Sequence, residues 1–196
     1  MKHSRGFTLV EIAIVMGIIA LMAGAILGGV TIVRAAGVAD AITTVQDLRA
    51  ASAAFRDRFH YYPGDFPVTT ELPGIGAGCA AGGNGDGAIS AAESACVMEH
   101  LVLAGLIRSP TTPMRLARFN SVVRIVSRAV STVPIPAGRQ SSINVIEIAT
   151  LPCDAAQEID LKLDDGNLGT GQVLGFNATC TPGGANDPLS LMAFSI

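Results

Sequence analysis

The feature that most constrains this chain is an unbroken apolar run at residues 6–33, in which Glu11 is the only charged residue. About 20 residues suffice for a helix to cross a bilayer, because each adds about 1.5 Å along the axis. A carboxylate within such a helix costs about 2.5–3.5 kcal/mol on insertion scales, so Glu11 needs a compensating partner. If the chain were cut between Gly6 and Phe7, the new α-amino group would lie one helical turn from Glu11 or could reach the Glu11 of a neighbouring copy.

The charges around this run predict its orientation. Lys2 and Arg5 precede it, and the next positive charge is Arg34. Positive residues favour the cytoplasmic side, so we expect a cytoplasmic N-terminus, a single crossing of the inner membrane and a periplasmic remainder. An ordinary signal anchor has a similar layout, but it gains nothing from a buried glutamate. A secretory cleavage site would also follow the apolar core instead of preceding it.

The helix is expected to continue beyond Arg34 in water. Residues that are apolar, apart from Ser52, recur every three or four positions and form a stripe, which is the spacing of an amphipathic helix face. No proline interrupts residues 7–62, and Pro63-Gly64 should end the helix. We therefore expect a membrane-spanning part at residues 7–33 and an amphipathic continuation at residues 34–62. The stripe comprises Val38, Ile42, Val45, Leu48, Ser52, Phe55, Phe59 and Tyr62.

The remaining residues, 63–196, can hold one modest globular domain. Gly and Pro predict a loop at residues 66–89, and helices are expected at residues 91–107 and from residue 153 or 154 to Gly166, where Asp164-Asp165-Gly166 fits a turn. Strand-like runs occur at 122–126, 130–135, 143–150, 172–177 and 189–196. The expected fold is α+β, with the long N-terminal helix packed on a small antiparallel sheet.

All four cysteines lie beyond the apolar run, namely Cys79, Cys96, Cys153 and Cys180. An even number in an oxidising compartment favours two disulfides. Three connectivities are open, of which sequential pairing, Cys79 with Cys96 and Cys153 with Cys180, closes the shortest loops. Zinc is the alternative, but the sequence has no close CxxC pair.

Residues 82–93 are spaced like a calcium loop of the EF-hand kind. Asn84, Asp86 and Ser90 fall at ligand positions three, five and nine, Ala88 supplies a carbonyl, and Glu93 stands at the bidentate twelfth position. The first ligand position does not match the pattern, because Gly82 stands where an aspartate belongs. In the alternative interpretation Ser90 caps a helix and Glu93 completes a capping box. Calcium is the one cofactor that the sequence suggests.

Two classes of function find no support in the sequence. No catalytic motif with recognisable spacing occurs, and the histidines are only His3, His60 and His100, of which His100 is best explained as a packed or capping residue. The net charge is −3, and basic residues do not cluster with aromatic ones, so nucleic-acid binding is not expected.

The stretch Gly6-Phe7-Thr8-Leu9-Val10-Glu11, with Lys2 and Arg5 before it and the apolar helix after it, resembles the leader of type IV pilins and type II secretion pseudopilins. In that family a membrane-embedded prepilin peptidase cuts after the glycine and methylates the new N-terminal residue. The resemblance implies a leader of residues 1–6, cleavage between Gly6 and Phe7, and N-methylation of Phe7. It also implies that Glu11 recruits each subunit and sets its register against the N-terminus of a neighbour.

The same resemblance implies a structural subunit and not an enzyme. Its partners would be prepilin peptidase, other pilin or pseudopilin subunits and an inner-membrane assembly platform, which extracts subunits into a pilus or pseudopilus. The choice among pilus, secretion and competence systems stays open. Many major pilins carry a proline near the position of Gly28, so major or minor status is open too. The alternative is an uncleaved, membrane-anchored periplasmic binding domain.

Overall fold

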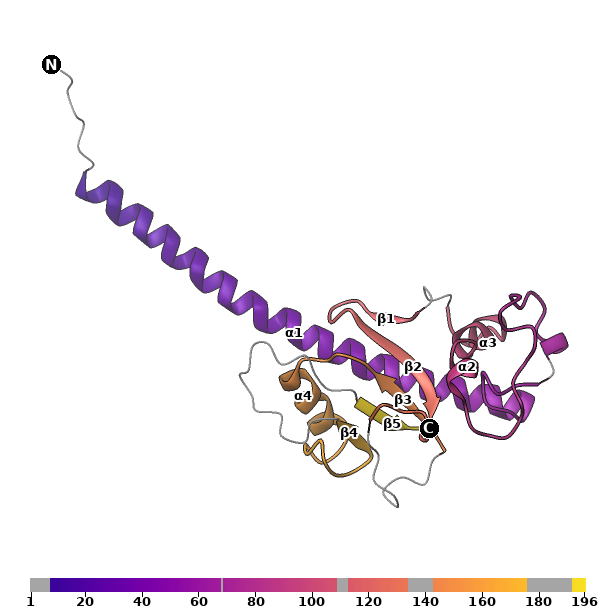
Figure 1. The fold of residues 1–196 in the computed structure, drawn as a ribbon. Helices are drawn as coiled ribbons and strands as arrows, with labels where there is room; N and C mark the ends of the chain where they lie inside the picture. The colour runs from indigo at the N-terminus through magenta and orange to yellow at the C-terminus, as the bar shows by residue number, and fades with distance from the viewer. Residues whose placement is uncertain (1–7, 68, 109–112, 134–142, 176–191) are drawn as a thin grey trace. The chain divides into compact units, whose positions relative to one another are not determined.

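The fold is α+β, as predicted, with one long helix and a small antiparallel sheet (Figure 1). The computed structural model describes residues 8–67, 69–108, 113–133, 143–175 and 192–196. The chain divides within the long helix into two compact units, Met1–Ala36 and Gly37–Ile196.

The long helix α1 spans Leu9–Phe59 without interruption, which confirms the prediction of one continuous helix. In the first unit, the described side chains from Thr8 to Ile26 are all exposed, although most are apolar. Ile12, Ile19 and Ile26 are 46%, 58% and 65% exposed. This part of α1 is long and apolar enough to cross a membrane by length and composition. Burial of such a surface requires lipid or other helices.

In the second unit, α1 buries the predicted stripe against the core. Val38, Val45 and Phe55 are fully buried, and Ser52 is only 2% exposed. Small residues that the stripe did not include, Ala41 and Ala51, are also buried. A Cβ atom placed on Gly37 would lie 2.9 Å from Cζ of Phe119, so glycine allows the chain to approach closely there.

The end of α1 lies three residues before the predicted one. His60 adopts a positive φ of 64° while its N–H donates to the carbonyl of Arg56 at 2.7 Å. A left-handed residue directly after a helix ends it, so Tyr62 does not continue the stripe as predicted. Instead the Tyr62 hydroxyl accepts a hydrogen bond from Arg56 Nη1 at 2.7 Å. The prediction relied on Pro63 and missed the turn before it.

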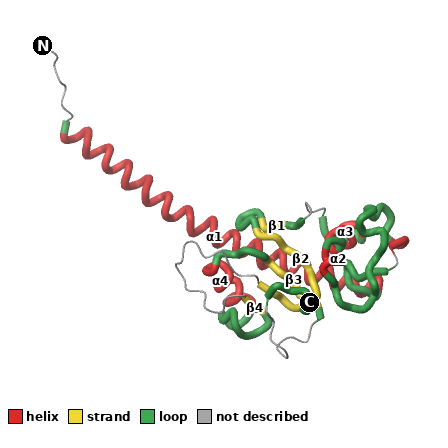
Figure 2. Tube along the Cα trace, in the orientation of Figure 1, coloured by secondary structure: helices red, strands yellow, loops and turns green. Residues whose placement is uncertain are grey.

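Five strands form one sheet in the order β1-β2-β3-β5-β4, and all neighbouring strands are antiparallel. Figure 2 draws the strands in yellow. The pairs Val123↔Ile148 and Ile125↔Ile146 face the core that contains the α1 stripe, whereas Val126↔Val145 lies in a second cluster. This alternation is the period of two that strands impose. The strands are β1 Arg115–Leu116, β2 Ser121–Ser127, β3 Asn144–Ile148, β4 Val173–Gly175 and β5 Met192–Ser195.

Most predicted strands are confirmed within the described residues, but the weak run at 130–135 is wrong. Its described part, 130–133, forms a turn in which the N–H groups of Val130 and Ser131 both donate to the Ser127 carbonyl at 3.0 Å. The buried Glu147 carboxylate then accepts the Thr132 N–H at 3.2 Å. Residues 134–135 lie outside the described part, and the short strand β1 was not predicted.

The predicted helix at 91–107 is divided into α2, Ala91–Ser94, and α3, Val97–Leu103. Gly105 follows α3 with a φ of 72°, and the N–H of Leu106 donates to the Leu101 carbonyl at 3.0 Å. This is a Schellman-type end, which the glycine makes favourable. A 3-10 turn, η1, covers Thr69–Glu71 in the predicted loop, and α4 spans Cys153–Leu163 as predicted.

Candidate functional site

The N-terminal end of α1 carries Glu11, the single charged residue of the apolar run at residues 6–33. Thr8 precedes the helix, and its Oγ1 accepts the N–H of Glu11 at 3.2 Å. In return, Glu11 Oε2 accepts the N–H and the hydroxyl of Thr8, each at 3.3 Å. This reciprocal pair is a capping box, which satisfies two donors that a helix start leaves without partners.

Glu11 therefore has a partner within its own helix, which the sequence analysis missed. The Thr-x-x-Glu spacing was visible in the sequence and is the usual signal of a capping box. Gly6 and Phe7 lie outside the described residues, so cleavage, methylation and the pairing of Glu11 with an amine stay predictions.

The proposed calcium loop is organised by hydrogen bonds within the chain. Ser90 Oγ accepts the N–H of Glu93 at 3.3 Å and Glu93 Oε2 accepts the N–H of Ser90 at 2.8 Å, which forms the capping box at the start of α2. Glu93 Oε1 accepts the N–H of Asn84 at 2.9 Å. Asp86 accepts the N–H of Ala88 at 2.8 Å and the side-chain amide of Asn84 at 2.9 Å. The carboxylate oxygens of the loop thus already have donors, and calcium there stays an untested prediction.

A buried carboxylate that the sequence analysis did not single out as a site residue, Asp65, fixes this loop. Its two oxygens accept the N–H groups of Gly85 at 2.7 Å and Gly87 at 2.8 Å. Burial raises the pKa of Asp65, while these two hydrogen bonds lower it. A Cβ on Gly83 would lie 2.4 Å from Cα of Asp65, so the loop can approach the backbone at Asp65 this closely only with glycine at that position. Asp65 acts as a structural anchor.

Cys79 and Cys96 form the predicted disulfide, with 5.6 Å between their Cα atoms. It joins the glycine-rich loop to the break between α2 and α3. Cys180 lies outside the described residues, so the pairing of Cys153 with Cys180 stays a prediction.

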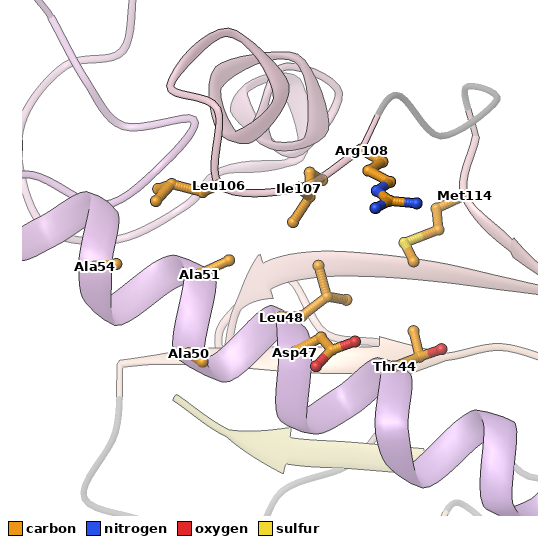
Figure 3. Close-up of a pocket in the computed structure, with 10 residues that line it drawn as sticks. All are labelled: Thr44, Asp47, Leu48, Ala50, Ala51, Ala54, Leu106, Ile107, Arg108 and Met114. Atoms are coloured by element: carbon orange, nitrogen blue, oxygen red, sulfur yellow. The ribbon is translucent and has the colours of Figure 1, made fainter.

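A groove of about 630 Å³ lies between α1 and the chain that follows α3 (Figure 3). Small and apolar side chains line most of it, including Leu48, Ala51 and Ile107. Asp47 and Arg108 are the charged residues among the ten that Figure 3 labels.

These features define an α+β protein whose N-terminal helix is long and apolar enough to span a membrane and carries a glutamate in a capping box in its first turn. Residues 1–27 match the family model of the prokaryotic N-terminal methylation motif, the signal of type IV pilins and pseudopilins. No curated protein and no solved structure matches the chain. The match is confined to the N-terminal segment of the 196-residue chain and supports processing by prepilin peptidase.

Proposed function

We propose that this chain is a structural subunit of a filament, either a type IV pilus or a type II secretion pseudopilus. Prepilin peptidase cleaves it after Gly6 and methylates Phe7, and the mature subunit waits in the inner membrane with its globular domain in the periplasm. The observation that carries the proposal is the methylation motif at residues 1–27 on a helix that is long and apolar enough to span a membrane.

The exposure of the first part of α1 supports assembly. A helix with this many exposed apolar side chains is stable only in lipid or packed against similar helices. Lipid supplies the first environment before assembly, and neighbouring copies of α1 supply the second within a filament core. Partner subunits and an assembly platform follow from this proposal, as does the absence of an enzymatic role.

The test is the mass of the mature protein. Protein purified from its native membrane should lack residues 1–6 and carry one methyl group on Phe7. Gly6→Leu should abolish cleavage, because the peptidase must reach the backbone at a residue with no side chain. The matched control is Gly24→Leu, the same substitution where a Cβ meets nothing within 4 Å, and this variant should be cleaved normally.

Unchanged cleavage of Gly6→Leu would contradict the proposal. An intact N-terminus in the wild-type protein would instead support the alternative function, an uncleaved and membrane-anchored periplasmic binding domain.

A further inference from the structure

The loop before α2 contains two dipeptides of a chemically unstable kind, Asn84-Gly85 and Asp86-Gly87. In each, a side-chain carbonyl carbon precedes a glycine nitrogen that no side chain shields. This nitrogen can attack the carbonyl carbon of the preceding side chain and close a five-membered succinimide ring. Asn84-Gly85 is the only Asn-Gly pair in the sequence, so the loop is the first place to look for this modification.

The products of this reaction would disturb the loop. In the first dipeptide, the Gly85 nitrogen loses its proton, bonds to Cγ of Asn84 and expels ammonia. In the second, the Gly87 nitrogen bonds to Cγ of Asp86 and expels water. Water then opens either ring to aspartate or isoaspartate. Aspartate at position 84 would lack the amide that donates to Asp86 Oδ2 at 2.9 Å, and isoaspartate would lengthen the main chain by a methylene group.

Burial does not protect the two reactive side chains. Asn84 and Asp86 are both exposed, so water and hydroxide reach them. Gly85 and Gly87 are only partly buried, with φ values of 74° and 88°. Protection of this loop therefore depends on what holds the attacking nitrogens.

Asp65 holds both attacking nitrogens through their N–H groups. Its Oδ1 accepts the N–H of Gly85 at 2.7 Å, and its Oδ2 accepts the N–H of Gly87 at 2.8 Å. The backbone carbonyl of Asp65 accepts the Gly85 N–H as well, at 3.2 Å. The Asp65 side chain is fully buried, so water does not compete for these bonds. Each glycine nitrogen must leave its charged acceptor before it can lose its proton and attack.

The reactive side chains are held too. Asn84 Oδ1 accepts the N–H of Asp86 at 3.0 Å, and Asp86 Oδ1 accepts the N–H of Ala88 at 2.8 Å. Bonds from a side-chain oxygen to the N–H two residues ahead are Asx turns. Ring closure requires these turns to open together with the Asp65 bonds.

We propose that Asp65 protects Asn84-Gly85 and Asp86-Gly87 against succinimide formation, and that the loop is a latent site of deamidation and isomerisation. One carboxylate serves both dipeptides because the loop brings their two nitrogens to its two oxygens. The carboxylate does not promote the reaction, since it is far too weak a base to remove an amide proton. The inference does not depend on the proposed filament function.

The experiment follows both reactions in the full-length protein in detergent, kept in warm, mildly alkaline buffer and then digested for peptide mass mapping. Deamidation of Asn84 appears as a gain in mass, and isoaspartate is detected by enzymatic methylation of the peptide. Four forms are compared. They are the wild type, Asp65→Ala without side-chain acceptors, Asp65→Asn with one acceptor, and the control Ser90→Ala. The control weakens the capping box of the same loop and leaves the Asp65 bonds in place.

In the folded wild type, deamidation of Asn84 should be at least about tenfold slower than in the chain unfolded in guanidinium, because the loop must open before it reacts. Asp65→Ala should remove most of this difference, and Ser90→Ala should react at the wild-type rate. If Asp65→Ala does not fold, Asp65→Asn should still accelerate one of the two reactions. Asp165-Gly166 is the internal reference, since the Asp65 carboxylate bonds Gly85 and Gly87, and its isomerisation should be equal in all folded forms.

Three results would overturn the inference. The first is a folded wild type that deamidates at Asn84 as fast as the unfolded chain. The second is a folded Asp65→Ala variant that reacts at the wild-type rate or more slowly, since the carboxylate would then be idle or act as a base. The third is an equal acceleration in Ser90→Ala, which would assign the protection to the order of the whole loop instead of to Asp65.

Discussion

At the scale of single residues, His100 shows how burial fixes a protonation state. It is fully buried on α3, nearly parallel to the Phe55 ring at 6.1 Å between centroids and edge-on to Phe66. Its Nδ1 accepts the N–H of Gly64 at 3.0 Å, so the ring is neutral there. Burial lowers the pKa of His100, although the charge of Glu99 opposes this shift.

The lowered pKa predicts a loss of stability in acid. The unfolded chain takes up a proton at the ordinary histidine pKa of about 6.5, while the folded state resists protonation to a lower pH. The free energy of unfolding should therefore be steady above about pH 7 and fall as the pH drops through about 6.5. Chemical denaturation between pH 7.5 and 5 measures this change.

His100→Asn is the matched variant, since its side chain keeps an acceptor near the position of Nδ1 and does not titrate. It should lose about 0.5–3 kcal/mol at pH 7.5 through poorer packing, yet show a weaker pH dependence than the wild type. Parallel pH profiles for the two proteins would assign the acid sensitivity to other groups.

At the scale of elements, the capping box of α2 explains Ser90 and Glu93 without a metal. Ser90→Ala removes the acceptor for the Glu93 N–H. It should therefore lower the free energy of unfolding by about 1 kcal/mol, equally in EDTA and in calcium buffer. Denaturant titration in both buffers measures this. Under the calcium interpretation of residues 84–93, Asp86→Ala would instead abolish a calcium-dependent gain, and a cost of Ser90→Ala confined to calcium buffer would favour that interpretation.

The disulfide between Cys79 and Cys96 stabilises the loop before α2. The cysteines are 17 residues apart, for which the chain-entropy model gives about 3 kcal/mol. The double variant Cys79→Ser with Cys96→Ser should lose about this much of the free energy of unfolding, measured against the oxidised wild type. Thiol labelling of unreduced, denatured wild type should find no free cysteine, and four labelled thiols would contradict the predicted oxidised state.

Periodicity predicted the long helices and the central strands because their burial repeats along the chain. It placed β2, β3 and α4 within a few residues. Elements fixed by contacts from elsewhere were missed. β1 spans two residues that pair only because β2 lies beside them, and the turn at 130–133 depends on the distant Glu147. No local pattern encodes such contacts.

At the scale of the whole molecule, the motif at the N-terminus was readable from the sequence, while the burial of Asp160 was not. Asp165 lies in the turn that the sequence predicts and accepts the N–H of Asn167 at 2.9 Å. Asp164 instead accepts the N–H of Val173, nine residues further on, at 2.9 Å. Asp160 is fully buried because α4 packs on the sheet, and spacing alone cannot show whether a carboxylate is buried.

Assembly of the molecule provides the last prediction, because Glu11 now has two candidate roles. In the first, its charge pairs with the N-terminus of a neighbouring subunit, as the resemblance implies. In the second, it only completes the capping box with Thr8. Glu11→Gln separates the two roles, since glutamine keeps an acceptor for the Thr8 N–H and loses the charge. Glu11→Val loses both and removes the insertion penalty of about 2.5–3.5 kcal/mol.

We expect both variants to remain in the membrane fraction and both to enter filaments poorly, scored as the share of subunit released by shearing. The charge is then the feature that assembly requires, because the two variants differ in capping but not in charge. Thr8→Val is the converse control. It removes the hydroxyl that caps the helix while keeping Glu11 charged, so it should assemble better than either Glu11 variant. Normal incorporation of Glu11→Gln beside a failing Glu11→Val would assign Glu11 to the helix cap and leave subunit registration to another residue.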